Sequence, residues 1–465
     1  MRCAIMDIGY NAIRAVVYES NKLGAPEIFN NKFKNDILSL LSNESLDIKH
    51  QTYLSIQYFL HVFKKLAVAE IKCVATAVLR EHPRAGDFID YVKGKYGFDI
   101  NIISGEEEAR LTAQGLMSGI ADTNGIAADL GGGSLELVEV QSGVVGKLES
   151  LALGTKVISS KNITSKNEIT KILKEKFNTQ CHYKNLYLIG GALRFIGRLY
   201  IDFTEYPIKN LHNLEITHES FSSYLAKIKS SSANVKSKLG KKRLNNNAIL
   251  VAEAMLEVFN PEKIIISTYG LKEGVRVELL DPADRLKDIV EEKVSYACNY
   301  DLAKTNFNSY FDILKPTIDS PEHYREVLKL AIILSSLKHR FDKTLPPKAI
   351  SEYILASEIP FKHRTRLMLA LVLAYSSNYK PEQDLLKLAK KILTKEEHAS
   401  CQIIGHFLQI AEEIDGPNFS TPSFSIKVKN LYLEIEWDGI LPRPTFEKVC
   451  ARLKSIAYAR KIYSN

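Results

Sequence analysis

The chain has 465 residues, a formal net charge of +8 and an ordinary composition with 45% hydrophobic and 25% charged residues. This length is too great for one core and predicts two to four domains. The composition excludes a disordered or fibrous protein, and no apolar run reaches the ~18 residues that a membrane helix needs. The six cysteines are scattered without CxxC spacing, which argues against a disulfide framework or a cysteine metal cluster. No basic segment precedes the first predicted strand, so a signal peptide is not expected and a cytoplasmic location is.

The first 300 residues alternate strands and helices, which predicts an α/β fold with a mixed or parallel sheet. In the first part, strands are expected within residues 4–18, at 71–75 and at 100–103, and helices at 55–66, 86–96 and 105–115. Residues 21–41 look polar and irregular, and residues 76–80 are expected to form a loop. The order then repeats, with strands within 125–140 and at 147–152, 186–189 and 263–267, and helices at 166–177, at 248–259 and after Gly270.

Beyond about residue 299 the pattern changes to helical periodicity. The segments with this periodicity are 322–336, 347–357, 362–375 and 382–393, and two strands are expected at 424–428 and 431–437. The sequence therefore predicts a helical appendix that ends in a small β element. The densest basic run, at 236–243, is expected to be a solvated loop, although net positive charge beside phosphate-binding turns would attract a polyanion.

The motif from Asp129 to Ser134 repeats the motif from Asp7 to Ala12. Each copy is predicted to be a strand, a tight turn and a second strand, which suggests two related lobes that face a shared cleft. Turns of free backbone N–H groups bind phosphate. Their carboxylates cannot bind phosphate directly, so a divalent cation or a polarised water is expected between acid and anion.

Asp129 ends an apolar strand, the position at which α/β sheets place ligand-binding loops. The glycines after it leave the backbone open to a phosphate. Glu136 lies two residues after Ser134, so both project from one face of the outgoing strand. Asp129 and Glu136 could share Mg²⁺, which typically takes one or two carboxylates and completes its shell with water and phosphate. The alternative is a glycine-rich hairpin turn with solvated acids.

Two further segments carry candidate residues. Ser104 and Glu107 have the spacing of a capping box, which would by itself explain both residues. A hydrolase also needs a carboxylate to orient or deprotonate water, and acids at a helix N-terminus beside the cleft offer one. Arg80 follows a strand, where its guanidinium could grip phosphate oxygens at two points, or could form a surface salt bridge instead.

These segments together resemble the exopolyphosphatase and guanosine pentaphosphate phosphohydrolase family, within the superfamily of actin and the sugar kinases. The matching motifs occur in the family's order over roughly residues 1–300: Met6–Asn11, Ala75–Arg80, Ile103–Arg110, Asp129–Glu136, Leu153–Gly154 and Gly270–Gly274. The resemblance implies two duplicated lobes of ribonuclease-H-like fold, as in actin, at residues 1–118 and 119–298. It implies that residues 299–465 form a helical domain that resembles a degenerate HD-type domain without metal ligands.

The resemblance also implies roles for single residues. Glu107 would be the catalytic base, Asp129 and Glu136 would bind Mg²⁺, and Asp7 would face them across the cleft. The residues expected to hold phosphate are Arg80, Gly9, Tyr10, Asn11, Gly131, Gly132, Gly133 and Ser134. The implied reaction is hydrolysis of the terminal phosphoanhydride of inorganic polyphosphate, with guanosine pentaphosphate as a second substrate and a homodimer as the assembly.

Some residues depart from the family's pattern. Tyr10, Ala12 and Ala77 stand where serines are usual, which removes hydroxyl contacts to phosphate. Ser335-Ser336 and residues 346–349 stand where longer members carry a His-Asp pair and histidines, which predicts a metal-free appendix used for packing, dimerisation or a basic channel. Two other functions stay open: a kinase of the same superfamily, and a sensor that binds guanosine tetra- or pentaphosphate without turnover.

Overall fold

The protein is described by a computed structural model for residues 1–34, 36–42, 49–177, 182–230, 245–340, 348–377, 380–429 and 432–461. The basic run at 236–243 and residues 346–347 lie outside this part of the chain. The chain forms two compact units, one of Met1–Tyr206 with Leu211–Ile289 and one of Pro207–Asn210 with Val290–Asn465. The domain boundaries expected from the sequence stay predictions. None of the described helices has the length and apolarity that a membrane crossing requires.

The first lobe of the larger unit is built on a five-stranded mixed sheet with the order β3-β2-β1-β4-β5. Its strands are β1 (Cys3–Ile8), β2 (Ala12–Tyr18), β3 (Glu27–Lys34), β4 (Glu70–Ala75) and β5 (Asn101–Ile102). Strand β1 pairs antiparallel with β2 and parallel with β4. The helices of this lobe are α1 (Ile37–Ser42), α2 (Gln51–Lys65), α3 (Ala77–Arg80) and α4 (Ala85–Tyr96). Tyr53, Phe59 and Phe88 from α2 and α4 pack with Met6 and Ile8 in one hydrophobic core.

The second lobe repeats this plan on a six-stranded sheet with the order β10-β11-β9-β6-β7-β8. Its strands are β6 (Asn124–Leu130), β7 (Leu135–Gln141), β8 (Val144–Leu151), β9 (Asn185–Ile189), β10 (Leu214–Thr217) and β11 (Lys263–Ile266). As in the first lobe, the leading strand pairs antiparallel with the next strand and parallel with a later one. The helices are α6 (Thr155–Ser160), α7 (Lys166–Lys176), α8 (Gly191–Phe203), α9 (His218–Ser230) and α10 (Asn246–Phe259).

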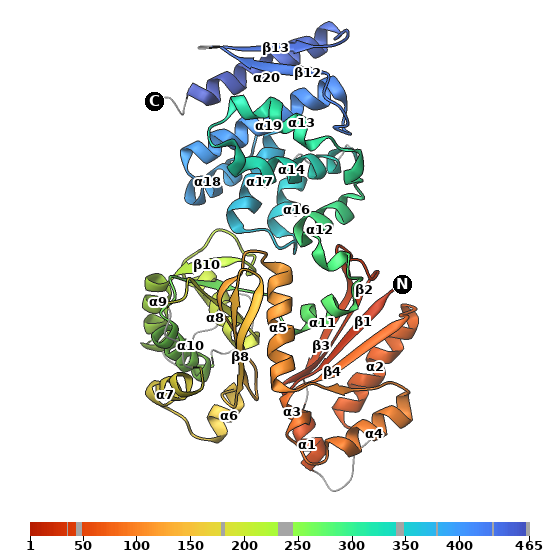
Figure 1. The fold of residues 1–465 in the computed structure, drawn as a ribbon, viewed down its shortest axis with the longest axis vertical. Helices are drawn as coiled ribbons and strands as arrows, with labels where there is room; N and C mark the ends of the chain where they lie inside the picture. The colour runs from red at the N-terminus through yellow and green to blue at the C-terminus, as the bar shows by residue number, and fades with distance from the viewer. Residues whose placement is uncertain are drawn as a thin grey trace. The chain divides into compact units, whose positions relative to one another are not determined.

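Two helices connect the lobes (Figure 1), namely α5 (Gly105–Gly119) and α11 (Leu271–Leu279). Ala109 and Ala113 of α5 pack on the second sheet, whereas Val275 of α11 packs on the first sheet. The two helices cross with their backbones in contact: a methyl group at Gly115 would lie 1.9 Å from the Gly270 carbonyl oxygen. A methyl group at Gly274 would lie 1.8 Å from a carbonyl oxygen of α5. Glycine at these positions therefore sets how closely the lobes approach.

The second unit is mainly helical, as predicted, with two strands near its end. Its helices are α12 (Ile289–Cys298), α13 (Phe307–Leu314), α14 (Arg325–Ser335), α15 (Leu337–Arg340), α16 (Ala349–Ala356), α17 (His363–Tyr375), α18 (Gln383–Ile392), α19 (Lys395–Asp415) and α20 (Arg443–Lys461). Strands β12 (Phe424–Val428) and β13 (Leu433–Trp437) form an antiparallel pair. The long helix α19 and the final helix α20 were not among the predicted segments.

The helical unit contains a buried serine and a half-buried ion pair. Ser335 donates from its Oγ to the Ile332 carbonyl oxygen at 2.7 Å, so its hydroxyl bonds within its own helix. Lys338 Nζ lies 3.0 Å from Glu412 Oε1 and 2.9 Å from the Ser376 carbonyl oxygen. An ammonium group therefore neutralises the carboxylate of Glu412.

Several local predictions were wrong in the first lobe. Residues 21–41 were expected to be irregular, but they contain β3 and α1. Strand β3 is an edge strand whose residues alternate between half-buried and exposed, and it carries Asn30, Asn31 and Lys32 in its middle. Because strand β3 is polar, its sequence lacks the alternation of apolar and polar residues by which a strand is recognised. Residues 77–80 form the short helix α3 rather than a loop.

Candidate active site

The two duplicated motifs fold into hairpin turns with the same hydrogen bond. In the first turn, the Gly9 N–H donates to the Ala12 carbonyl oxygen at 3.0 Å. In the second turn, the Gly131 N–H donates to the Ser134 carbonyl oxygen at 3.0 Å. Each turn joins the first two strands of its sheet, β1 to β2 and β6 to β7. The sequence repeat is therefore a repeat of structure.

The two turns touch each other. A methyl group at Gly132 would lie 2.6 Å from Asn11 Nδ2, and one at Gly133 would lie 3.4 Å from Tyr10 Cδ2. A methyl group at Gly133 would also lie 2.9 Å from the Ala77 side chain, at the start of α3. The glycines thus let both turns and the helix of Arg80 meet at one place.

Two carboxylates stand opposite each other beside the second turn. Asp129 on β6 is the register partner of Glu136 on β7. The Glu136 side chain is buried, with 2% of the residue exposed, and accepts a hydrogen bond from Ser150 Oγ at 3.0 Å. Burial and the negative charge of Asp129 raise the pKa of Glu136 to about 7. Burial also raises the pKa of Asp129, although the charge of Arg194 opposes that rise.

The first turn carries the third predicted acid, Asp7, in different surroundings. Its register partner is Arg14, whereas the partner of Asp129 is another acid. Burial raises the pKa of Asp7 to about 6, the positive charges of Lys32 and Arg14 lower it, and the charge of Asp129 raises it further. Within the part of the chain that the structure describes, Asp7 Oδ1 is buried and lacks a hydrogen-bond partner.

Glu107, the predicted base, does not face these carboxylates. Its N–H donates to Ser104 Oγ at 3.0 Å, so Ser104 caps α5 as predicted. The Glu107 carboxylate accepts two bonds from Arg110, at 2.7 and 2.8 Å, and this hydrogen bonding lowers the pKa of Glu107. Arg110 in turn reaches Glu278 on α11 at 2.5 Å. The structure therefore places Glu107 in an ion-pair cluster where α5 crosses α11.

The next residue, Glu108, lies beside the other acids. Its Oε2 lies 3.2 Å from Arg80 Nη1, and its side chain is 13% exposed. Burial and the negative charges of Glu136 and Asp129 raise the pKa of Glu108 well above its usual range, against the lowering effect of Arg80. Consecutive helical residues point about 100° apart, so only one of the adjacent acids can face this group.

Arg80 contacts the acidic residue Glu108 from the first lobe. Its Nη1 donates to the Ile103 carbonyl oxygen at 2.9 Å as well as to Glu108. A methyl group at Gly105 would lie 2.6 Å from Ser150 Cβ and 3.8 Å from Arg80 Nη2. Gly105 therefore lets the end of β8 in the second lobe approach the arginine of the first. Glu108 and Ser150 are the residues of this site that the sequence interpretation missed.

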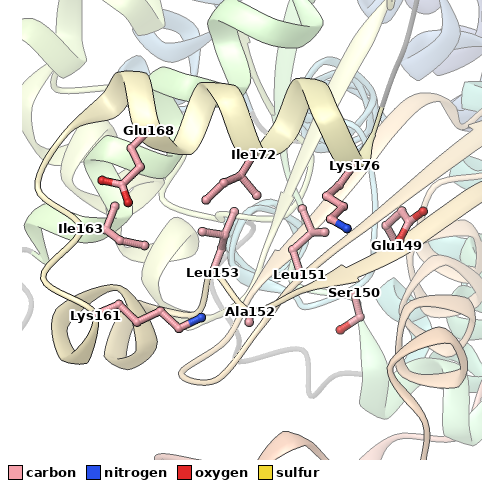
Figure 2. Close-up of a pocket in the computed structure, with 10 residues that line it drawn as sticks. All are labelled: Glu149, Ser150, Leu151, Ala152, Leu153, Lys161, Ile163, Glu168, Ile172 and Lys176. Atoms are coloured by element: carbon pink, nitrogen blue, oxygen red, sulfur yellow. The ribbon is translucent and has the colours of Figure 1, made fainter.

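A hollow of about 450 Å³ opens beside β8 and α7 (Figure 2). Leu153 and Ile172 give it an apolar wall, and the side chains of Lys161 and Lys176 lie at its opposite ends. Ser150 belongs both to this hollow and to the group of carboxylates, since its hydroxyl bonds to Glu136. The hollow is therefore a neighbour of the candidate site.

Comparison with known proteins supports this architecture. The Ppx/GppA phosphatase of Aquifex aeolicus (type II variant) is 20% identical, covers 60% of this chain and 100% of its own, and superposes with a TM-score of 0.51. An exopolyphosphatase from Cytophaga hutchinsonii is 17% identical over 60% of this chain and 98% of its own, with a TM-score of 0.51. These likenesses show the fold, and the predicted pair of actin-like lobes followed by a helical region is confirmed. The sequence profile of the Ppx/GppA phosphatase family matches residues 16–283, more than half of the chain, and the protein therefore belongs to that family.

Proposed function

We propose that this phosphatase is an exopolyphosphatase, which hydrolyses the terminal phosphoanhydride of inorganic polyphosphate and releases orthophosphate. The observation that carries the proposal is the contact between Arg80 and Glu108 next to Asp129 and Glu136, close to where two glycine turns meet. An arginine and backbone N–H groups suit the oxygens of a phosphate, and a carboxylate suits the water that attacks it.

Glu108 takes the role of base in this proposal, in place of Glu107. The Glu107 carboxylate is held by Arg110, whereas Glu108 lies in the acid group with a raised pKa. A base whose pKa approaches the working pH transfers protons most efficiently. The ion pair with Arg80 holds the Glu108 carboxylate in place.

The reaction would proceed by in-line attack of water on the terminal phosphorus. The water oxygen forms a bond to phosphorus, its proton passes to Glu108, and the bond from phosphorus to the bridging oxygen breaks. The remaining chain leaves with the electrons of that bond and is one phosphate shorter. Arg80 and the backbone N–H groups of the two turns would hold the negative charge that spreads over the phosphoryl oxygens.

The residues present fit a magnesium ion. Asp129 and Glu136 oppose each other, and burial together with the charge of Asp129 raises the free energy of the ionised form of Glu136, which a divalent cation would relieve. No set of three or more His, Cys, Asp or Glu side chains in the described residues is arranged to hold a metal alone. Mg²⁺ commonly uses one or two carboxylates and completes its shell with water and substrate phosphate. Asp129 and Glu136 would hold the ion, Asp7 would add negative charge, and the ion would stabilise charge on the phosphate oxygens.

Guanosine pentaphosphate is the second candidate substrate. The observation in its favour is the hollow of about 450 Å³ beside Ser150, whose Leu153 and Ile172 wall could take a nucleobase. Inorganic polyphosphate has no apolar group to use that wall. The homodimer and the cytoplasmic location also stay proposals.

Phosphate release distinguishes these functions. Purified protein with Mg²⁺ would be given long-chain polyphosphate or guanosine pentaphosphate at equal phosphate concentration, and orthophosphate would be measured over time, with EDTA as the control. We expect faster release from polyphosphate and a loss of release in EDTA. Tight binding of guanosine pentaphosphate without release would support the sensor, and transfer of phosphate from ATP to an acceptor would support the kinase. Either result would contradict the proposal.

A further inference from the structure

Tyr10 and Lys156 form a contact between the lobes at the edge of the second turn. The Tyr10 ring lies against the turn, because a methyl group at Gly133 would be 3.4 Å from Tyr10 Cδ2 and 3.9 Å from Tyr10 Cε2. Lys156 Nζ lies 4.5 Å from the centroid of the same ring. The ring of the first lobe therefore has the second turn and a lysine of the second lobe as neighbours.

The backbone of Lys156 is fixed to the second turn. Three consecutive N–H groups, those of Gly154, Thr155 and Lys156, donate to the carbonyl oxygens of residues 133, 131 and 132, at 3.2, 3.1 and 2.9 Å. A methyl group at Gly154 would lie 2.2 Å from the Gly133 carbonyl carbon, so this segment and the turn are in close backbone contact. The backbone of Lys156 is therefore anchored to the turn that is proposed to hold phosphate, and its side chain starts beside that turn.

The contact with Tyr10 restrains the ammonium without using its hydrogen bonds. A cation over an aromatic face is held by the ring quadrupole, and the ammonium keeps three N–H donors. Lys156 is exposed, so these donors can reach a ligand in solvent. The aromatic ring thus limits where the positive charge can be, close to the turn, while leaving it able to bind an anion.

We propose that Lys156, positioned by Tyr10, is a second phosphate subsite, which binds an inner phosphate of a linear inorganic polyphosphate. This inference rests on the proposed function, because the terminal phosphate must occupy the turns and Arg80. A compact ammonium binds phosphate as a point charge and needs no nucleobase or sugar.

The test measures binding without turnover. In a Glu108→Gln background, the affinity for inorganic tripolyphosphate and for long-chain polyphosphate would be measured by calorimetry, with and without Lys156→Gln. We expect Lys156→Gln to weaken binding of both ligands about tenfold, which corresponds to the loss of about 1.4 kcal/mol. The matched control is Lys147→Gln, which removes an exposed lysine that lies 5.1 Å from the ring centroid of Phe177 in the same lobe. This control should change neither affinity.

A double-mutant cycle tests whether Tyr10 positions Lys156. Tyr10→Leu keeps an apolar side chain but removes the aromatic face, so polyphosphate binding should weaken about two- to fivefold, as expected for a cation–π contact. The same change should have no effect in the Lys156→Gln protein, because the cation is already absent. Equal effects of Tyr10→Leu in both backgrounds would mean that the ring does not position the lysine.

The outcomes separate this subsite from the proposed function. If the parent protein binds polyphosphate and Lys156→Gln binds it equally well, the subsite is refuted while the function stands. If the parent neither binds nor hydrolyses polyphosphate, the function itself fails. In active protein, Lys156→Gln should raise KM for polyphosphate and leave kcat within about twofold, since the lysine contacts no reacting atom. A loss confined to kcat would overturn the assignment.

Discussion

Two adjacent glutamates of α5 allow a direct test of which carboxylate is the base. Glu108→Gln keeps the size of the side chain but cannot accept a proton. We expect kcat for polyphosphate hydrolysis to fall about 10²- to 10⁴-fold, the usual contribution of a general base, or roughly 3 to 5 kcal/mol of transition-state stabilisation. Arg80 loses a charged partner but keeps its bond to the Ile103 carbonyl oxygen, so the fold should survive.

Glu107→Gln is the matched control, one residue away. Its carboxylate pairs with Arg110, and both side chains are about 40% exposed, at 37% and 40%. A helical pair of this spacing contributes about 0.2–0.5 kcal/mol to stability. Arg110 also keeps its contact to Glu278. We therefore expect a melting temperature lowered by a degree or so and kcat within about twofold of the parent protein.

Both variants would be compared by steady-state phosphate release from polyphosphate under saturating Mg²⁺. Circular dichroism and thermal melting would confirm that each protein is folded. The reasoning is refuted if Glu107→Gln abolishes release while Glu108→Gln retains it, because the acid beside Arg80 would then be dispensable. Equal, small effects of both changes would show that neither carboxylate takes the proton.

Four further outcomes are expected, three from other parts of the molecule and one at Arg80 in the candidate site. Arg366→Met should lower the free energy of unfolding by about 3 kcal/mol in urea titrations, because this fully buried guanidinium donates to three backbone carbonyl oxygens. Gly274→Ala should cost about 2 kcal/mol by the same measurement, since its methyl group would meet a carbonyl oxygen, while Gly191→Ala, with open space around it, should be neutral or slightly stabilising. Burial lowers the pKa of His406 below its ordinary value of 6.5, so the folded state favours the neutral imidazole. The resulting contribution to the free energy of unfolding is present above pH 6.5 and is lost as the pH falls below that value. His406→Gln should therefore flatten the fall of the melting temperature on acidification. Arg80→Lys keeps the charge but loses the planar fork, and we expect kcat for phosphate release to fall by roughly 10²-fold.

Much of the fold follows from local pattern. The hairpins around Gly9 and Gly131 were predicted because apolar strands flank a glycine turn in both copies, and the register confirms them. The helices α8 and α9 and strand β10 were not predicted. Edge strands such as β3 and β10 are short or polar, because one side of the strand meets solvent instead of a neighbouring strand. Their sequences therefore lack the apolar period that identifies central strands.

The candidate site could be predicted to the level of segments but not of every side chain. Asp129 and Glu136 were placed together correctly because a hairpin fixes which residues oppose each other. Glu107 and Glu108 are neighbours on α5, so their side chains point in different directions. The packing of α5 between the two sheets decides which of the two faces the second lobe. The capping pattern in the sequence correctly predicted the hydrogen bond from the Glu107 N–H to Ser104, but it does not indicate which acid faces the second lobe. The roles assigned to these residues stay predictions.

The duplicated hairpins differ in the residue that lies opposite the acid of the repeat. In the first hairpin the residue opposite Asp7 is Arg14, so the local charge is close to neutral. In the second hairpin the residue opposite Asp129 is Glu136, and burial of both raises the free energy of their ionised forms. A cation or a proton is therefore favoured at the second hairpin and less so at the first. In the proposed mechanism this asymmetry would place the metal in the second lobe, while the first lobe would supply Arg80 and backbone contacts to the phosphate.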